Sequence, residues 1–205
     1  MDIKLNKKHY AFSNYVNKKR WMSYYYQLNL IYQLNPRKIL EVGVGDNFLK
    51  KNIRDIFKIT TLDIDKSLNP DIIASVTDIP LSNCSFDLIV CFQVLEHLPL
   101  EEFPKAIKEV ARISKDYVVI SLPFAHHEIL NFSISFFKKR TLYFKLRIPK
   151  FWKKCKHDGE HHWEIGNKSC SKTKIDKEIL NYFIIVDCFI PVENSYHIFY
   201  ILKKI

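Results

Sequence analysis

Glycine is the residue that this sequence most clearly lacks. The chain of 205 residues contains four, whereas a usage of about 7% would give about 14. They stand at positions 43, 45, 159 and 166, so two of the four are separated by a single residue. Because glycine is used so sparingly, we expect Gly43 and Gly45 to serve a backbone conformation or a close approach that other residues do not allow.

The sequence also lacks paired cysteines and long apolar runs. Its five cysteines are an odd number, at positions 84, 91, 155, 170 and 188, and none are two residues apart, which excludes a disulfide framework or a thiolate zinc site. No segment approaches the roughly 20 apolar residues of a membrane span. The N-terminal sequence, which begins Met1-Asp2-Ile3-Lys4-Leu5-Asn6, contains no apolar run of signal-peptide length. These absences predict a cytoplasmic protein in a reducing compartment.

The length and composition predict one folded domain. Apolar residues make up 47% of the chain and aromatic residues 14%, which excludes a disordered chain and provides for a core. We expect a single domain over 1–205. It divides into a helical segment at 1–37, a core at 38–121, an insertion at 122–171, and a closing helix and hairpin at 172–205.

The net charge of +10 is unevenly distributed. Residues 1–38 carry a net charge of +7, residues 39–121 of −4, residues 122–171 of +6 and residues 172–205 of +1. A strongly basic chain suggests a nucleic acid or another anionic partner, but here an acidic core lies between basic flanks. An AT-rich coding sequence, which favours Lys, Asn and Ile over Gly, would equally explain the total.

The hydrophobic pattern predicts a doubly wound α/β fold. Short apolar runs alternate with helical stretches at 46–57 and 100–112, which is typical of βαβ units with a parallel sheet. The predicted parallel strands are 39–42, 60–62, 71–74, 86–92 and 117–122. A helix at 172–181 precedes two closely spaced strands, 183–190 and 196–202, which predict an antiparallel hairpin. The result is a mostly parallel seven-stranded sheet with a C-terminal antiparallel hairpin.

Two further segments complete the predicted fold. Residues 8–34 are rich in Tyr and Trp and predict one or two helices that end at Asn35, ahead of Pro36. An aromatic stripe of this kind is typical of a helix packed as a lid on the core. After the fifth strand, about fifty basic, aromatic and turn-prone residues form an insertion, which we expect to cover the ends of the parallel strands.

The first candidate binding motif is Glu41-Val42-Gly43-Val44-Gly45-Asp46-Asn47, which follows the first strand and opens a helix. An open α/β sheet binds nucleotide-like ligands at such a corner, beyond the ends of its strands. A nicotinamide fingerprint would require a third glycine at position 48, which is Phe48, so a dehydrogenase is disfavoured. An acid two positions before the first glycine suits a cationic or amine-bearing ligand.

Three further elements follow in order along the chain. Asp63 ends the second strand, where a carboxylate can accept hydrogen bonds from both ribose hydroxyls. Asp78 follows the third strand, where it could accept a hydrogen bond from an adenine amino group. The fourth strand runs through Phe92 and Gln93 into the sequence VLEHLP at 94–99.

Together these four elements resemble a class I S-adenosylmethionine-dependent methyltransferase, and VLEHLP resembles a segment of its small-molecule subgroup. The resemblance covers residues 38–122 and implies S-adenosylmethionine as cofactor and S-adenosylhomocysteine as product. The cofactor-binding residues that it implies are Glu41, Gly43, Gly45, Asp46, Asn47, Asp63, Ile64, Asp78, Ile79, Phe92 and Gln93. Asn47 departs from the family, which often has a third glycine there, but Asn tolerates a left-handed backbone. The acidic core suits a sulfonium cation that also carries an ammonium group.

Histidines mark the acceptor side. Five of the eight lie in the insertion, and a neutral imidazole is a suitable base for a hydroxyl. We hypothesise that His126, His127, His161 or His162 takes the acceptor's proton. Glu96 and His97 are interpreted as structural residues near a helix terminus. A metal site built from His157, His161, His162 and Glu164 is disfavoured, because the spacing of these residues fits no metal motif. In addition, Gly159 and Gly166 would break any helix that aligned His157 with His161. No metal is expected.

The acceptor is predicted to be a small anionic molecule, and O-methylation is favoured over N-methylation. The insertion is basic, as a nucleotide-linked sugar or phosphate-bearing precursor would require, although a solvated basic face would look the same. The run GEHHWEIG at 159–166 resembles uncharacterised methyltransferases from surface-polysaccharide gene clusters. The basic residues are Lys138, Lys139, Arg140, Lys145, Arg147, Lys150, Lys153, Lys154 and Lys156.

Two other functions stay open. An RNA-modifying methyltransferase would use the basic flanks and aromatic residues to stack bases; the candidates are Tyr24, Tyr25, Tyr26, Phe151 and Trp152. The lack of a recognised RNA-binding module and of an Asn-Pro-Pro-Tyr type of motif disfavours nucleic acid as a partner. A non-catalytic protein that binds the cofactor without turnover is the other alternative. The sequence does not indicate an oligomeric state.

Overall fold

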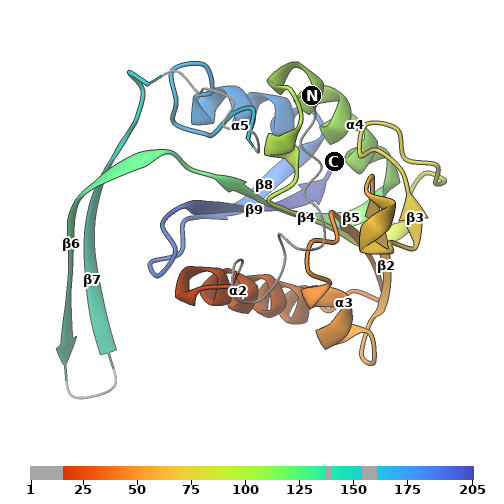
Figure 1. Cartoon of the computed structure of the whole chain (residues 1–205), viewed down its shortest axis with the longest axis horizontal. Coiled ribbons are helices and arrows are strands. Elements are labelled where there is room, and N and C mark those ends of the chain that lie inside the picture. The colour runs from red at the N-terminus through yellow and green to blue at the C-terminus, as the bar shows by residue number, and fades with distance from the viewer. Residues whose placement is uncertain (1–15, 137–139, 154–160) are drawn as a thin grey trace.

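A central sheet with helices on both faces forms the body of the protein, and a long hairpin projects from it (Figure 1). The computed structural model describes residues 16–136, 140–153 and 161–205. Helices α4 (Phe103–Ile113) and α5 (Lys172–Leu180) lie on one face of the sheet, and α2 (Lys18–Leu34) and α3 (Phe48–Ile53) lie on the other. Among the described residues, no helix is long and apolar enough to cross a membrane.

The sheet has seven strands in the order β3-β2-β1-β4-β5-β9-β8. Their bounds are β1 Lys38–Val42, β2 Lys58–Asp63, β3 Ile72–Ile73, β4 Phe86–Phe92, β5 Ser114–Pro123, β8 Phe183–Phe189 and β9 His197–Lys204. Strands β1 to β5 pair in parallel, whereas β9 runs antiparallel to both β5 and β8. The predicted doubly wound sheet with a C-terminal antiparallel hairpin is therefore confirmed.

The strands are apolar on both faces because helices cover both sides of the sheet. Successive residues Ile39 and Leu40 of β1 are both fully buried, and they belong to different halves of the core. The half under α4 and α5 contains Phe103 and Trp163, and the half under α2 and α3 contains Ile31. This explains why these strands appear in the sequence as continuous apolar runs.

Helix α2 begins and ends at asparagines. The side chain of Asn17 accepts a hydrogen bond from the backbone N–H of Arg20 at 3.0 Å and caps the first turn. Asn35 takes a left-handed conformation, with a φ of 43°, immediately before Pro36. The predicted end of the helix at Asn35 agrees with the structure, because Pro36 disfavours helical geometry in the residue before it.

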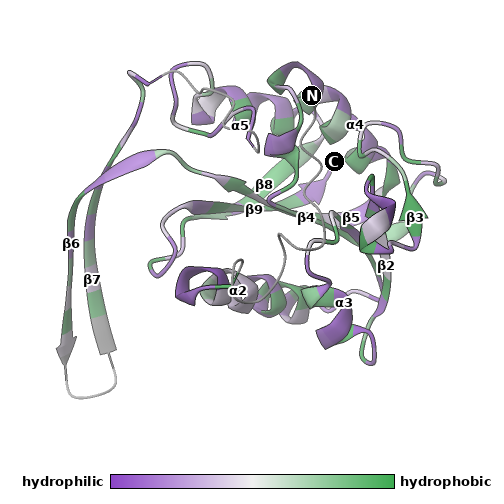
Figure 2. Cartoon of the chain, viewed as in Figure 1, coloured by the Kyte–Doolittle hydropathy of each residue, from purple (hydrophilic) through white to green (hydrophobic). Residues whose placement is uncertain are grey.

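The insertion forms a long antiparallel hairpin of β6 (His126–Phe136) and β7 (Arg140–Pro149), so the expectation of a turn-prone segment over the strand ends is wrong for these residues. The hairpin projects away from the body, and Figure 2 shows hydrophobic residues along both strands. One face consists of apolar cross-strand pairs that are 43–53% exposed. They are Leu130 with Leu146, Phe132 with Phe144, and Ile134 with Leu142. A register shift between Glu128 and Leu130 interrupts the alternation that identifies a strand.

Candidate active site

The loop after β1 makes a tight corner through three left-handed residues. The φ angles are 82° at Gly43, 53° at Gly45 and 63° at Asn47, which directly precedes α3. The expectation that Asn47 tolerates this conformation is confirmed. A Cβ atom at Gly43 would lie 2.2 Å from Cγ2 of Val94. Gly43 therefore allows the loop after β4 to pack directly against the loop after β1.

Asp63, at the end of β2, holds this corner in place. Its Oδ2 accepts a hydrogen bond from the backbone N–H of Val44 at 2.8 Å, and its Oδ1 accepts one from that of Asp65 at 2.8 Å. Each carboxylate oxygen has a second lone pair that a ligand hydroxyl could use. The neighbouring Ile64 is 68% exposed. The carboxylate therefore connects the ends of β1 and β2 and leaves capacity for a ligand.

Glu41 brings a buried carboxyl group to the same corner. It is 5% exposed, and among the described residues its Oε2 has no hydrogen-bond partner. Burial, together with the nearby charge of Asp46, raises the pKa of Glu41 well above its usual value. A buried carboxyl oxygen without a partner is costly. A cationic or hydrogen-bonding ligand group would satisfy it.

The aromatic face of α2 packs against this corner. The hydroxyl of Tyr24 donates to Oδ2 of Asp46 at 2.6 Å, and its ring stacks on Phe48 at a centroid distance of 3.9 Å. Trp21 contacts both rings edge-on. Tyr24 is thus buried and committed to internal contacts, which removes it from the aromatic residues proposed to stack RNA bases. The sequence did not reveal the Tyr24–Asp46 contact because it joins two distant segments.

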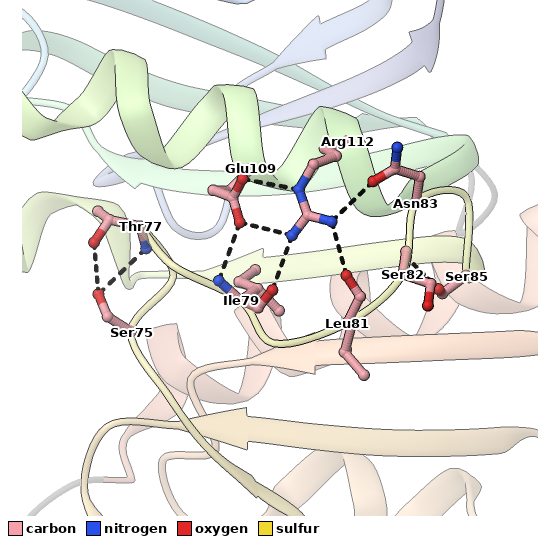
Figure 3. Close-up of polar contacts among 9 residues, drawn as sticks. All are labelled: Ser75, Thr77, Ile79, Leu81, Ser82, Asn83, Ser85, Glu109 and Arg112. Carbon is pink, nitrogen blue, oxygen red and sulfur yellow. Dashed lines mark hydrogen bonds and ion pairs between the residues drawn. The ribbon is translucent and has the colours of Figure 1, made fainter.

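The loop that carries Asp78 and Ile79 is fastened to α4. The guanidinium of Arg112 donates to the carbonyl of Ile79 at 2.8 Å and to that of Leu81 at 2.7 Å (Figure 3). Glu109 accepts from the backbone N–H of Ile79 at 3.0 Å and pairs with Arg112 at 2.8 Å. The hydrogen bond from Arg112 lowers the pKa of Glu109. Asp78 is exposed and Ile79 is buried, so the loop presents the carboxylate and anchors the apolar side chain.

The carboxyl end of β4 lies next to the corner that follows β1. Val42 of β1 lies beside Cys91 in the sheet, so Phe92 and Gln93 follow β4 next to the first loop. Gln93 has a φ of 57°, and its backbone N–H and side-chain amide both donate to Ser121, at 3.0 and 3.2 Å. Of the residues that the sequence analysis named for the cofactor, Glu41, Asp63 and Phe92 thus lie at the carboxyl ends of β1, β2 and β4, and the others lie in the segments that follow these strands and β3.

The four candidate histidines have different surroundings. His161 lies against Glu96, Glu164 and Tyr196. The backbone N–H of His162 donates to the carbonyl of Glu96 at 2.9 Å. His126 lies at the base of the hairpin with its Nδ1 2.9 Å from the carbonyl of Phe124, and burial lowers the pKa of His126.

His127 is exposed at the base of the hairpin, where its ring stacks on Trp152 at 5.5 Å. His157 and Gly159, which the sequence analysis also named, lie outside the described residues. The structure therefore brings His161 and His162 to the loop after β4, whereas His126 and His127 accompany the hairpin.

Glu96 is the site residue that the sequence analysis underestimated. It lies in the 3₁₀ turn Leu95–His97 and is fully buried, which its interpretation as a structural residue near a helix terminus did not predict. Burial raises the pKa of Glu96 to about 7. Among the described residues, neither carboxylate oxygen has a hydrogen-bond partner. Its position directly after β4 was the one sequence signal that could have identified it.

Comparison with known proteins supports the same region as functional. Residues 40–120 match the model of a methyltransferase domain. No curated protein matches the chain in sequence. The match spans the strands and loops that form the corner described above.

The fold is shared with solved methyltransferase structures. An S-adenosylmethionine-dependent methyltransferase from Clostridium acetobutylicum aligns with a TM-score of 0.60 and 12% identity, over 96% of this chain and 95% of that one. The N-methyltransferase NodS from Bradyrhizobium japonicum, in complex with S-adenosylhomocysteine, aligns with a TM-score of 0.57 and 11% identity, over 92% of this chain and 93% of that one.

The 1,6-didemethyltoxoflavin-N1-methyltransferase from Burkholderia thailandensis, with 1,6-didemethyltoxoflavin and S-adenosylhomocysteine bound, aligns with a TM-score of 0.57 and 12% identity, over 100% of this chain and 93% of that one. The residues present fit that type of cofactor. Glu41 offers an ammonium group a buried oxygen that has no partner within the described ranges, and Asp63 retains acceptor capacity for ribose hydroxyls. Residues 40–120 thus match a methyltransferase-domain model, and the chain shares the fold of solved S-adenosylmethionine-dependent methyltransferases.

Proposed function

We propose that the protein transfers a methyl group from S-adenosylmethionine to a small anionic acceptor. The single observation that carries the proposal is the acidic corner at the carboxyl edge of the sheet. There Glu41 is buried, its Oε2 has no hydrogen-bond partner in the described part of the chain, and three left-handed residues turn the adjacent backbone sharply. Carboxylates in that position attract a ligand that carries both a sulfonium and an ammonium charge.

Each element of the corner has a separate role in this proposal. Glu41 receives the ammonium group, Asp63 the ribose hydroxyls, and Asp78 and Ile79 the adenine side. Gly43 and Gly45 keep the backbone open to the ligand. The clamp made by Glu109 and Arg112 fixes the loop of Asp78 before the ligand arrives, which lowers the entropy lost on binding.

The bound cofactor supplies a methyl group on a positively charged sulfur. A nucleophilic oxygen of the acceptor would form the new C–O bond as the C–S bond breaks, the electron pair would stay on sulfur, and the hydroxyl proton would leave. Holding the acceptor in line can contribute about 7–11 kcal/mol. One of His126, His127, His161 and His162 accepts the proton, and His161 has the strongest case because two carboxylates, Glu96 and Glu164, lie beside it.

Basic side chains at the base of the hairpin support an anionic acceptor. Lys145 is already paired with Glu128 at 3.4 Å. The Nε of Arg147, in contrast, is buried and has no hydrogen-bond partner among the described residues. A guanidinium in this state suits a phosphate or carboxylate. We therefore favour a phosphate-bearing or nucleotide-linked sugar, of the kind used for surface polysaccharides, and O-methylation over N-methylation.

Calorimetry with S-adenosylhomocysteine tests the cofactor site. We expect Asp63→Asn to weaken binding at least tenfold, or about 1.4 kcal/mol, because the remaining amide group replaces one acceptor oxygen with a donor. Asp55→Asn removes the same charge from a side chain that is 89% exposed and serves as the control. Equal affinities for the two variants would contradict the assignment of Asp63.

Turnover identifies the acceptor class. With radiolabelled cofactor, we expect label to enter nucleotide-linked or phosphorylated sugars. Transfer to RNA instead would favour an RNA-modifying enzyme. Binding of S-adenosylhomocysteine without transfer to any cell extract would favour a non-catalytic cofactor-binding protein.

A further inference from the structure

Three potential metal ligands meet on the acceptor side of the loop after β4. Glu96 and His97 come from the 3₁₀ turn Leu95–His97, and His161 comes from a segment more than sixty residues later. One ligand atom from each lies within 4.8 Å of the others. The rings of His97 and His161 are 5.1 Å apart and inclined at 61°. We propose that Glu96, His97 and His161 bind a divalent transition-metal ion.

Glu96 provides the main reason for a cation here. The residue is fully buried, and neither of its carboxylate oxygens has a hydrogen-bond partner among the described residues. The closest ion-pair partner is Nε2 of His161, at 4.0 Å, and Arg20 adds positive charge at longer range. A buried carboxylate requires closer compensation than this. A bound cation between Glu96 and the two imidazoles would provide it.

The orientation of His161 is a second, independent reason. Its Nε2 faces Glu96, and its Nδ1 lies 3.8 Å from Oε1 of Glu164 and 3.3 Å from the hydroxyl of Tyr196. The hydroxyl of Tyr196 also donates to Glu164. Histidines that bind metals usually give their other ring nitrogen to a carboxylate, which fixes the tautomer and leaves a lone pair for the metal. In His161, Glu164 and the Tyr196 hydroxyl likewise lie on the Nδ1 side of the ring and Nε2 faces Glu96, with Tyr196 the nearer of the two groups to Nδ1.

The donor set indicates which ions fit. One carboxylate and two imidazoles suit Mn²⁺, Fe²⁺, Co²⁺ or Zn²⁺, whereas Mg²⁺ and Ca²⁺ prefer oxygen ligands throughout. Three protein ligands leave coordination positions open, as in catalytic metal sites. The metal reading in the sequence analysis took His161 together with His157, His162 and Glu164. The site proposed here shares only His161 with that set as a ligand. Glu164 is not a ligand but lies beside Nδ1 of His161, on the side of the ring away from the ion.

The site would deepen the proposed function, and this part rests on that function. An acceptor oxygen bound to the cation would lose its proton more readily, and an anionic acceptor would be oriented by the positive charge. The Nε2 of His161 would then be a metal ligand, so the acceptor's proton would pass to solvent and not to His161. The methyl group would form its bond to the deprotonated oxygen as its bond to sulfur breaks.

Titration of the full chain with Mn²⁺ tests the site directly. After treatment with a chelator and its removal, we expect calorimetry and Mn²⁺ spin resonance to show one bound ion per chain. Mn²⁺ is the better first probe because it prefers oxygen and imidazole ligands over the thiols of the free cysteines. Zn²⁺ is then compared with Mg²⁺, which we expect to bind at least tenfold more weakly.

Four variants locate the ion. We expect Glu96→Gln and His161→Gln each to weaken Mn²⁺ binding at least 100-fold, and Glu164→Gln to weaken it about tenfold through the orientation of His161. His127→Gln, in an exposed histidine at the hairpin, is the matched control and should bind as the wild type does. If Glu96→Gln does not fold, the other two site variants decide the question.

The proposal is overturned if the stripped wild type does not bind Mn²⁺ or Zn²⁺ at 1 mM, or if Glu96→Gln and His161→Gln bind as tightly as His127→Gln. Calorimetry with S-adenosylhomocysteine on the same samples shows whether a negative result concerns the metal site or the proposed methyltransferase function. Cofactor binding without metal binding would reject the metal site alone. Metal binding without cofactor binding would reject the methyltransferase and keep the site.

Discussion

At the scale of single residues, Gly43 serves packing as well as ligand approach. The sequence analysis expected Gly43 to serve a backbone conformation or a close approach, and the structure shows both, since its φ is 82° and a Cβ there would meet Val94 at 2.2 Å. We expect Gly43→Ala to lower the free energy of unfolding by about 1–3 kcal/mol, through overpacking and backbone strain. Urea denaturation measures this directly.

A double variant separates the two causes. Val94→Ala shortens the side chain that Gly43→Ala would contact, so we expect the double variant to be less destabilised than the sum of the single variants. Additive losses would show that the left-handed backbone accounts for the whole effect. Cofactor affinity, measured in parallel, shows how much of the loss belongs to the ligand.

His197 gives stability a pH dependence of known sign. Its ring is buried beside Ser23, with Nδ1 2.7 Å from the hydroxyl, and burial lowers its pKa from 6.5 to about 3. The unfolded chain binds a proton below pH 6.5 and the folded chain does not, so this contribution to stability is full above pH 6.5 and declines from there towards pH 3.

The variant His197→Asn tests that dependence. We expect its free energy of unfolding to fall less steeply than that of the wild type between pH 6 and pH 4, by about 1.4 kcal/mol per pH unit for one proton. His127→Asn, which changes an exposed ring, should keep the wild-type slope. Parallel curves for all three proteins would show that His197 is charged in the folded state.

At the scale of elements, the parallel strands and the closing hairpin could be predicted because their signal is local. Strand β4 is apolar except for Asp87, and α2 ends at Asn35 because Pro36 follows. Strands β6 and β7 were missed because a register shift breaks their alternation, and because their apolar face is exposed where a strand is expected to bury it.

The candidate site divides in the same way. Glu41 and Asp63 could be found from the sequence because they stand at the carboxyl ends of β1 and β2, and Asp78 because it lies in the loop after β3. The carboxyl ends of parallel strands share one edge of a sheet. The surroundings of Glu96 could not be predicted, because the segment that brings His161 against it lies more than sixty residues away. Contacts of this kind leave no pattern in the local sequence.

The clamp between α4 and the loop after β3 is expected to support both stability and binding. Arg112 donates to two backbone carbonyls and pairs with Glu109. We expect Arg112→Gln to lower the free energy of unfolding by about 1–3 kcal/mol, typical of hydrogen bonds to a charged group. Cofactor affinity should fall as well, because the loop of Asp78 is released.

Arg54→Gln provides the matched control for Arg112→Gln. Arg54 is 66% exposed and forms a long ion pair of 3.8 Å with Asp55, so its loss should change neither quantity. Urea denaturation and calorimetry with S-adenosylhomocysteine measure the two effects. If Arg112→Gln is destabilised but keeps its affinity for S-adenosylhomocysteine, the clamp contributes to stability and not to cofactor binding.

At the scale of the whole molecule, the charge of +10 misleads when taken as a total. The acidic residues concentrate in the core segment, and Glu41, Asp46 and Asp63 lie at the corner after β1, where the cofactor is proposed to bind, whereas the excess of basic residues belongs to the flanks. A ligand at the corner contacts half-buried groups, which salt screens little. A polyanion on the basic flanks would release many counterions, and its affinity would fall steeply with salt.

Salt dependence therefore discriminates between the two kinds of partner. Between 50 and 500 mM salt, we expect the affinity for S-adenosylhomocysteine to change by less than about threefold, as measured by calorimetry. Any binding of a single-stranded RNA, followed by fluorescence anisotropy, should weaken by orders of magnitude over the same range. RNA affinity that survives 500 mM salt and rises with bound S-adenosylhomocysteine would instead mean that the two sites are coupled, and the RNA-modifying function would replace the small acceptor.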